Sequence, residues 1–409
     1  MKRILFLSYN YPSGNFGPST NCTTRIMKKL CESGNYKISC VSYESRGVDA
    51  YDYLPGIELL RLPIKAKRRL LPRWAKQFLT IIKIPLFPFG QLFASHRLYR
   101  ATRDLIRGMH FDLVICQYLP EESLLSGVWL KKHGQINNLM VIFWDNIYGK
   151  LPRRIIPKHF ALRRHRWAEG FVAKYADQLV SLYPIKSFHE KYGELPEAKG
   201  KREYLGIPSV IRPQVISSSE KQGVIVSGKI NILYSGTIFR ESYVEYLVDL
   251  LNDTPLADQI NLVFFQRGVS SEKWDALKKR FRGSIYSSGW IPLQDLLAFY
   301  SKADFFISFP GVPTSICSKL YEYVSYGKPI LVLYDDDTDV NITAFSRYPA
   351  FYCVDTRCRA AEKALDVSFF IQSNNGRTIL FEECERLFAK DSPQAFVELI
   401  DKILEKNKS

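Results

Sequence analysis

The chain has 409 residues, and its 57 lysines and arginines exceed its 41 aspartates and glutamates to give a net charge of +16. With 46% hydrophobic and 24% charged residues it has the composition of a globular protein, which excludes wholesale disorder and leaves room for two domains. Its eight scattered cysteines include no C-x-x-C pair, so we expect neither a zinc site nor a disulfide framework and favour a reducing cytoplasm.

The first half of the chain alternates short apolar runs with helix-like stretches. We predict that the apolar runs are strands, at residues 4–8, 38–42, 113–116, 140–143 and 179–182. Such alternation is typical of βαβ units on a parallel sheet. The first run covers only five residues, too few for a signal peptide, and no run is long enough to predict a membrane span.

A glycine-containing loop, YPSGNFGPST at residues 11–20, follows the first predicted strand and opens a helix. Glycine loops at this place are common in Rossmann-like folds. The spacing of Gly14 and Gly17 does not form G-x-G-x-x-G, so dinucleotide binding is disfavoured.

The positive charge is concentrated in two stretches of the first half. Residues 61–107 hold twelve basic residues and one acid, and residues 150–174 hold eight and one. Bulky apolar side chains are interleaved with the first stretch, a combination that suits the surface of an anionic bilayer. The predicted membrane or acceptor surface comprises Lys67, Arg68, Arg69, Arg73, Trp74 and Lys76. Ordinary helices with solvated basic faces remain an alternative, and a nucleic-acid surface meets only the electrostatic criterion.

A turn-rich polar stretch separates two series of predicted elements. In the second series we predict strands at residues 230–234, 262–265, 285–287, 305–308, 330–333 and 351–354, and an amphipathic helix over 396–404 behind Pro393. The predicted fold is α/β. It comprises an N-terminal Rossmann-like domain (1–190), a linker region (191–228), a C-terminal Rossmann-like domain (229–390) and a terminal helix (391–409).

The most informative motifs lie in the second domain. They are GWIP at 289–292, YSKAD at 300–304, SKLYEY at 318–323 and GKP at 327–329. Their order and spacing closely resemble the nucleotide-sugar half of GT-B glycosyltransferases, especially retaining enzymes of glycosyltransferase family 4. The resemblance implies two Rossmann-like domains facing a central cleft, with the terminal helix crossing back onto the first domain.

The resemblance also implies a donor site at SKLYEY. Ser318, Lys319 and Leu320 would open a helix whose free N–H groups and dipole favour a diphosphate, and Lys319 adds a cation. In the family, the glutamate at the place of Glu322 holds the ribose. Thr314 stands where the family often has the first glutamate of E-x7-E, which contacts the donor sugar. The alternative is a plain helix start with a glutamate that favours the dipole.

Further donor contacts are expected from Gly236, in a glycine turn after a strand, and from Arg240 and Arg267 as phosphate cations, although both arginines suit ordinary surface loops equally well. The resemblance also places Gly17 beside the donor phosphate. Asp145 follows a strand where the family frequently has a histidine or an H-D pair. It is the candidate catalytic residue, to orient the acceptor hydroxyl or stabilise an oxocarbenium-like transition state, unless it only forms a turn.

These features together predict a retaining glycosyltransferase. It would move a sugar from a nucleoside diphosphate to a glycan or lipid-linked acceptor in surface polysaccharide assembly, peripheral at the inner face of the membrane. We expect no cofactor, no metal and no nucleic-acid partner, and we interpret the three aspartates at 335–337 as an exposed loop. A nucleotide-sugar epimerase and a catalytically idle GT-B subunit that binds a membrane or protein partner stay open as alternatives.

Overall fold

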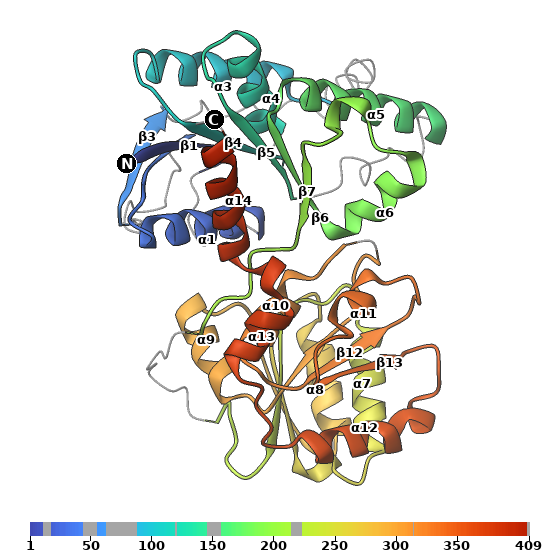
Figure 1. The fold of residues 1–409 in the computed structure, drawn as a ribbon. Helices are drawn as coiled ribbons and strands as arrows, with labels where there is room; N and C mark the ends of the chain where they lie inside the picture. Colours follow the sequence, from blue (N-terminus) through green and yellow to red (C-terminus); the bar gives the residue numbers. More distant parts are fainter. Residues whose placement is uncertain are drawn as a thin grey trace. The chain divides into compact units, whose positions relative to one another are not determined.

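The computed structural model of the protein describes residues 1–10, 18–43, 55–62, 88–118, 121–144, 157–213, 223–313 and 315–406. The chain divides into two compact units (Figure 1). The N-terminal unit comprises Met1–Pro208 together with Lys390–Ser409, and the C-terminal unit comprises Ser209–Ala389. Within the described ranges, no helix has the length and hydropathy needed to cross a bilayer.

The N-terminal unit is built on a seven-stranded parallel sheet of order β3-β2-β1-β4-β5-β6-β7. Its strands are β1 (Lys2–Asn10), β2 (Tyr36–Tyr43), β3 (Ile57–Leu62), β4 (Leu113–Tyr118), β5 (Leu139–Phe143), β6 (Gln178–Leu182) and β7 (Arg202–Leu205). Every residue of β4 and β5 is buried, as expected for central strands covered on both faces.

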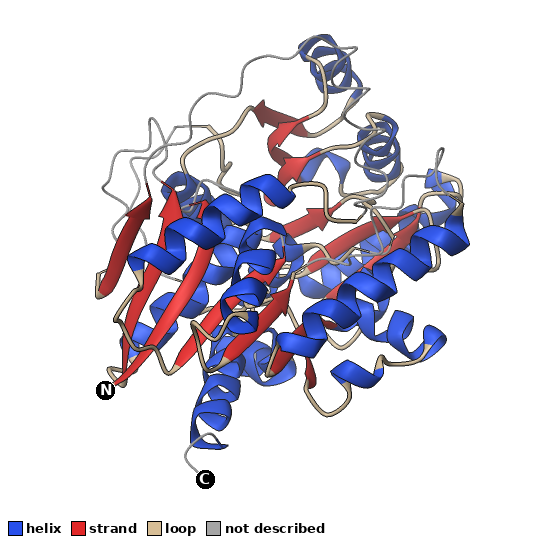
Figure 2. Cartoon of the chain, turned by 90° about the horizontal axis from the view of Figure 1, so that it is seen from above, coloured by secondary structure: helices blue, strands red, loops and turns tan. Residues whose placement is uncertain are grey.

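Helices cover both faces of this sheet. They are α1 (Pro18–Glu32), α3 (Leu92–Leu105), α4 (Glu121–Lys132), α5 (Lys158–Tyr175), α6 (Tyr183–Tyr192) and α14 (Pro393–Lys406), with the 3₁₀ turn η3 (Pro196–Ala198). In Figure 1, α3, α4 and α5 lie above the sheet, α1 lies below it, and α14 runs downward in front of it. Figure 2 shows the chain from above, with helices crossing over the strands.

The last helix packs on the N-terminal unit. Its residues Phe396 and Ile400 are fully buried, and the Phe396 ring lies 5.6 Å from the ring of Trp144, which follows β5. Tyr36 in β2 donates a hydrogen bond to Asp401. Apolar burial and this polar contact hold the chain's last helix against β2, Trp144 and α1.

The C-terminal unit has a six-stranded parallel sheet of order β10-β9-β8-β11-β12-β13. Its strands are β8 (Ile230–Thr237), β9 (Ile260–Arg267), β10 (Ser284–Ser288), β11 (Phe305–Ser308), β12 (Ile330–Tyr334) and β13 (Phe351–Asp355). Its helices are α7 (Ser242–Asn252), α8 (Ser271–Arg280), α9 (Leu293–Lys302), α10 (Ser318–Ser325), α11 (Val340–Phe345), α12 (Ala360–Asn374) and α13 (Phe381–Leu387), with the 3₁₀ turn η4 (Ala257–Gln259). The 3₁₀ turn η5 (Ala389–Asp391) begins at the last residue of this unit and continues into the N-terminal one.

The predicted pair of Rossmann-like domains is confirmed, and every predicted strand is present. Two further strands, β3 and β7, were not predicted. β7 lies inside the range expected as a linker, where it pairs with β6 and extends the N-terminal sheet. Of the two charged residues in its sequence REYL, Glu203 is exposed at the sheet edge, and the Arg202 side chain is buried and paired with Glu169. The strand therefore lacks the apolar run by which central strands are recognised.

Candidate functional site

The candidate site lies at the carboxyl edge of the C-terminal sheet, where β8 and β11 pair. From β8 the sheet continues to β9 and β10 on one side, and from β11 it continues to β12 and β13 on the other. At such a reversal of strand order, the connections that leave two neighbouring strands diverge to opposite faces of the sheet, and the crevice between them is where open α/β sheets bind ligands.

Lys319 joins the two sides of this reversal. It lies in the first turn of α10, and its Nζ donates to the Oγ of Ser235 in β8 at 3.2 Å. Gly236 follows with a φ of 145°, and a Cβ added there would lie 3.1 Å from the Lys319 Cε and 3.0 Å from the Tyr234 hydroxyl. A side chain at position 236 would therefore be strained and would push Lys319 away. The structure brings together two predicted donor residues, Gly236 and Lys319.

Two buried tyrosines hold the end of β8 in place. The Tyr323 hydroxyl accepts a hydrogen bond from the Ser235 N–H at 3.1 Å, and the Ser235 Oγ bonds to the Tyr300 hydroxyl. The Tyr323 ring stacks on Phe306 of β11 with centroids 4.1 Å apart. Burial raises the pKa of both tyrosines, so both hydroxyls stay neutral. They support Ser235 beneath the Lys319 ammonium.

Cys317 stands at the N-cap position of α10, and its thiol makes no capping hydrogen bond. Burial raises the pKa of this thiol, while the backbone N–H groups of Leu320 and Lys319 and the Lys319 charge oppose the rise. The N–H groups of the first turn therefore lack the strong side-chain acceptor that a serine or aspartate cap supplies. The predicted residue Ser318 is half-buried here, and the Leu320 side chain is fully buried, which leaves only its backbone near the site.

Glu322 is half-buried one turn into α10. Burial first, and then the charge of Glu322, raises the pKa of Tyr326 to about 12. The same carboxylate also contributes to the raised pKa of Tyr300. Glu322 therefore lies close to the aromatic cluster beneath the site.

A clamp formed by Asp339 and Asn341 fixes the loop that leads into α10. Asn341, only 6% exposed, accepts from the Cys317 N–H at 2.8 Å and donates to the Ser315 carbonyl at 3.1 Å. Asp339 caps α11 and accepts from both the backbone N–H and the side chain of Asn341, at 2.9 and 2.7 Å. The Val340 N–H donates to the Pro313 carbonyl at 2.9 Å. The sequence does not predict this clamp, because Asp339 and Asn341 at the start of a helix indicate only a cap and not a contact with residues 315–317.

The two predicted phosphate arginines have local partners at the same sheet edge. The Nη1 of Arg240 is 3.4 Å from the Asp335 Oδ2, an oxygen that also accepts from the Tyr243 hydroxyl at 2.6 Å. The guanidinium of Arg267, at the end of β9, lies 4.7 Å from the centroid of the exposed Trp290 ring. Arg240 is 69% exposed, so its surface pair contributes little stability and can be broken.

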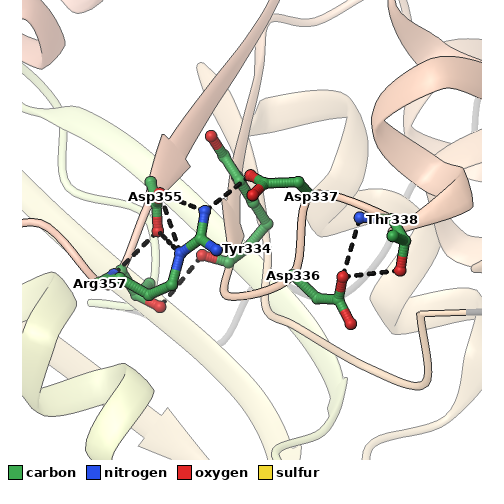
Figure 3. Close-up of polar contacts among 7 residues, drawn as sticks. Tyr334, Asp336, Asp337, Thr338, Asp355 and Arg357 are labelled. Carbon is green, nitrogen blue, oxygen red and sulfur yellow. Dashed lines mark hydrogen bonds and ion pairs between the residues drawn. The ribbon is translucent and has the colours of Figure 1, made fainter.

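The three aspartates after β12 face three different partners. Asp335 faces Arg240, as above. Figure 3 shows Asp336 turned to Thr338, whose N–H and hydroxyl donate to it at 2.8 and 2.6 Å, and Asp337 turned to Arg357 at 2.6 Å. Arg357 also binds Asp355 and holds the pKa of that carboxyl below its usual range. Among the described residues, no three His, Cys, Asp or Glu side chains are grouped to hold a metal ion.

Comparisons with known proteins identify the fold. The chain matches HepE from Anabaena, solved with UDP and glucose, at 13% identity over 99% of this chain and 100% of HepE, with a TM-score of 0.61. It matches WaaG, described as a glycosyltransferase involved in lipopolysaccharide biosynthesis, at 14% identity over 97% and 99%, with a TM-score of 0.56. The chain has the GT-B fold.

A protein from Listeria monocytogenes, described as a candidate UDP-N-acetylglucosamine 2-epimerase, has the same architecture, at 12% identity over 99% of this chain and 98% of its own, with a TM-score of 0.57. No protein-family model matches the sequence. No curated protein matches it either.

The remaining predicted residues of this GT-B chain lie outside the described ranges. They are Gly17, Asp145, Lys67, Arg68, Arg69, Arg73, Trp74 and Lys76, and Thr314 is outside as well. Beside them in sequence, the indole N–H of Trp144 donates to the Gln117 Oε1 at 2.7 Å, and Thr23 of α1 bonds to the same oxygen. Sequence reasoning missed Gln117, a buried polar residue at the carboxyl end of β4, because it follows an ordinary apolar strand.

Proposed function

We propose that the protein is a retaining glycosyltransferase that uses a nucleoside-diphosphate sugar. The observation that carries this proposal is the reach of Lys319 from the start of α10 to Ser235, beside Gly236, at the strand-order reversal of a GT-B fold. A lysine ammonium, a helix N-terminus and a glycine that keeps the surface open suit a diphosphate.

Electrostatics explain how the donor diphosphate would be held. The N-terminus of a helix carries about half a positive charge, and Lys319 adds a full one. The N–H groups of the first turn, which Cys317 does not cap, would bind phosphate oxygens. Arg240 would contribute by exchanging its exposed pair with Asp335 for a phosphate. We propose that these groups stabilise the leaving diphosphate without a bound metal or a cofactor.

Glu322 is proposed to bind the ribose of the donor. It lies three residues after Lys319 and four after Ser318, so the three side chains share one side of α10. A carboxylate there can accept hydrogen bonds from two vicinal hydroxyls, each worth about 1.5 to 3 kcal/mol because the acceptor is charged. The diphosphate and the ribose would then bind along a single helix.

The acceptor is proposed to be a glycan or a lipid-linked glycan at the cytoplasmic face of the membrane, in surface polysaccharide assembly. Two observations support this part: the net charge of +16 with its concentration in the first half of the chain, and the fold shared with WaaG. Asp145 is proposed to orient the acceptor hydroxyl or to stabilise charge at the anomeric carbon.

A binding experiment tests the donor site. UDP, GDP, ADP and CMP, with their common sugars, are titrated into the protein in EDTA by calorimetry. We expect one nucleoside diphosphate to bind, and Lys319→Met to weaken it by about 10- to 150-fold, the loss of one charged hydrogen bond. The matched control is Lys328→Met, which removes the same charge beyond the other end of α10, where Lys328 contacts Thr378. Equal weakening in both variants would contradict the assignment of Lys319.

An epimerase is the second candidate function, since a protein described as one shares the fold. An epimerase converts a nucleotide sugar to its isomer with no acceptor, whereas a transferase releases the nucleoside diphosphate. Incubation with the donor that binds, followed by chromatography of the nucleotide sugar, distinguishes them. A donor that binds and remains unchanged with every acceptor would favour the idle subunit.

A further inference from the structure

Helix α5 presents a row of aromatic side chains away from the core. Phe160, Trp167, Phe171 and Tyr175 follow one another at spacings of seven, four and four residues, so they lie on one face of the helix. Phe160 is 43% exposed and Trp167 is 51% exposed. Trp167 stacks on Phe171 with centroids 6.2 Å apart, and Phe171 contacts Tyr175 at 5.5 Å. The buried residues of α5 lie beside this row, and Ala161, Ala168 and Val172 among them are fully buried.

Basic side chains accompany the aromatic row. Arg163 is exposed, the Arg164 guanidinium lies 4.6 Å from the Trp167 centroid, and the Lys174 ammonium lies 5.7 Å from the Tyr175 centroid. The one acid of α5, Glu169, is buried and bound by His189 and Arg202 at 2.9 and 2.6 Å. The exposed face of α5 therefore carries positive charge and no negative charge. We call it the α5 stripe: Phe160, Arg163, Arg164, Trp167, Phe171 and Lys174.

Helix α3, which packs against α4 as α5 does, carries a second set of exposed aromatic and basic side chains. Phe93 is 93% exposed, and the exposed Arg97 and Arg100 follow it at helical spacing. Phe89, just before α3, lies 6.4 Å from Trp167 of the α5 stripe. In Figure 1 both helices lie on the same side of the N-terminal sheet. Two helices thus offer aromatic and basic side chains on one side of the unit.

We propose that the α5 stripe binds the surface of an anionic lipid bilayer. Tryptophan and tyrosine rings prefer the headgroup region, phenylalanine enters the acyl boundary, and the long arginine and lysine side chains reach the phosphates beside them. Charge complementarity with anionic lipids fixes the occupant. The α5 stripe would bring the protein to a lipid-linked acceptor, and this part of the inference rests on the proposed function. It locates the membrane surface in α5, outside residues 67–76.

Two other occupants fit less well. A second copy, packed through the same stripe about a twofold axis, would bring two sets of Arg163, Arg164 and Lys174 together, at a like-charge cost. A single-stranded nucleic acid would stack its bases on exposed aromatic faces. Arg164 already lies over one face of Trp167, and Phe171 stacks on the same ring. The ring edges that remain suit insertion between lipids.

The test is co-sedimentation of the full chain with vesicles of phosphatidylcholine and phosphatidylglycerol, and with phosphatidylcholine alone. We expect binding to the anionic vesicles, reduced about 30-fold by Arg163→Gln with Lys174→Gln. The charge control is Lys278→Gln with Lys279→Gln, two exposed lysines of α8 in the other unit, which should bind like the parent. Equal loss in both double variants would show attraction by net charge alone and overturn the proposal.

The aromatic residues are tested separately, with all charges kept. Phe160→Ser with Trp167→Ser should lower binding at least about tenfold, whereas Phe369→Ser, which removes a 72% exposed ring from α12, should not. Lipids brominated on their acyl chains should quench part of the tryptophan fluorescence, and Trp167→Phe should abolish that quenched part. Quenching that persists in Trp167→Phe would place the contact elsewhere and refute the inference.

The remaining outcomes separate this inference from the proposed function. Donor binding, measured in the same variants, should stay unchanged, because the stripe belongs to the N-terminal unit. If the protein binds vesicles through the stripe but binds no nucleotide sugar, the proposed function is wrong and the membrane surface at α5 is still supported. If a single-stranded oligonucleotide displaces the protein from vesicles, the stripe binds nucleic acid instead. If light scattering shows a dimer that the aromatic variant no longer forms, the stripe binds a second copy of the chain instead.

Discussion

The clamp at Asn341 allows a prediction that links a buried amide to donor binding. In Asn341→Ala, the Cys317 N–H loses its acceptor and the Ser315 carbonyl loses a donor, at contacts of 2.8 and 3.1 Å. Ser315 is exposed, so water can replace its lost partner, whereas the N–H of the half-buried Cys317 loses a bond worth about 1 to 2 kcal/mol. That free energy also holds the loop in its binding arrangement.

Loss of the clamp lowers the fraction of molecules with an ordered start of α10, and the apparent dissociation constant rises by the inverse of that fraction. A clamp worth about 1 to 2 kcal/mol corresponds to a rise of about 5- to 30-fold. Calorimetric titration of the bound nucleoside diphosphate measures this change, and urea unfolding measures the accompanying loss of stability.

The matched control is Asn374→Ala in α12. Asn374 is 7% exposed, donates to the Phe370 carbonyl at 2.9 Å and accepts from Arg377 at 2.9 Å. Its substitution should therefore lower the free energy of unfolding by a similar amount, at a position far in sequence from α10. We expect Asn374→Ala to bind the nucleotide like the parent protein. Asn341→Ala with a dissociation constant within about twofold of the parent, despite its lower stability, would refute the link between clamp and ligand.

Three further substitutions probe the supports of the two units. Gly236→Ala should cost about 1 to 3 kcal/mol in urea unfolding and weaken nucleotide binding, because φ is 145° there, whereas Gly289→Ala, with open space around its Cβ, should do neither. Tyr323→Phe keeps the ring but leaves the Ser235 N–H without its acceptor, so unfolding should require about 1 to 3 kcal/mol less free energy. Burial lowers the pKa of His165 to about 4, and the Glu169 charge opposes this shift. In the unfolded chain the pKa is about 6.5, so the unfolded state binds a proton more readily between these two values. The free energy of unfolding should therefore be highest above about pH 6.5 and fall as the pH drops towards 4. His165→Asn should flatten that part of the profile of unfolding free energy against pH, and an unchanged profile would assign the acid sensitivity to other groups.

The sequence predicts the central strands well because they are buried on both faces. The run at 113–116 became β4, in which every residue is buried, and the run at 140–143 became β5. The edge strands β3 and β7 escaped prediction for the opposite reason. With one neighbour and partial burial they admit charged residues such as Arg61 and Glu203, which interrupt their apolar runs.

The donor site could be predicted only where a local motif carries it. SKLYEY marked the start of α10, and Lys319 was found from that motif alone. Its contact with Ser235 joins residues 84 positions apart, and the pair of Arg240 with Asp335 joins residues 95 apart. Such contacts depend on strand order, which one sequence does not reveal. Asn341 was missed for the same reason.

The α5 stripe shows a second limit of sequence reasoning. Aromatic residues at helical spacing usually belong to a core, so Trp167 and Phe171 indicated nothing unusual in the sequence. Only the 51% exposure of Trp167, against the full burial of Ala161 and Ala168 on the same helix, shows that the row reaches the surface. The basic residues of this segment were noticed, but their alignment with the aromatic face depends on where the helix meets the sheet.

The most direct test of the central claim is a product analysis. The protein is incubated with the nucleotide sugar that binds and with a membrane lipid extract in EDTA, and mass spectrometry follows both the nucleotide and the lipids. We predict release of the nucleoside diphosphate together with a lipid-linked product that is heavier by one sugar residue, and neither in Lys319→Met. A nucleotide sugar converted to an isomer with its diphosphate intact, or no change in any donor by a folded protein that binds it, would contradict glycosyl transfer.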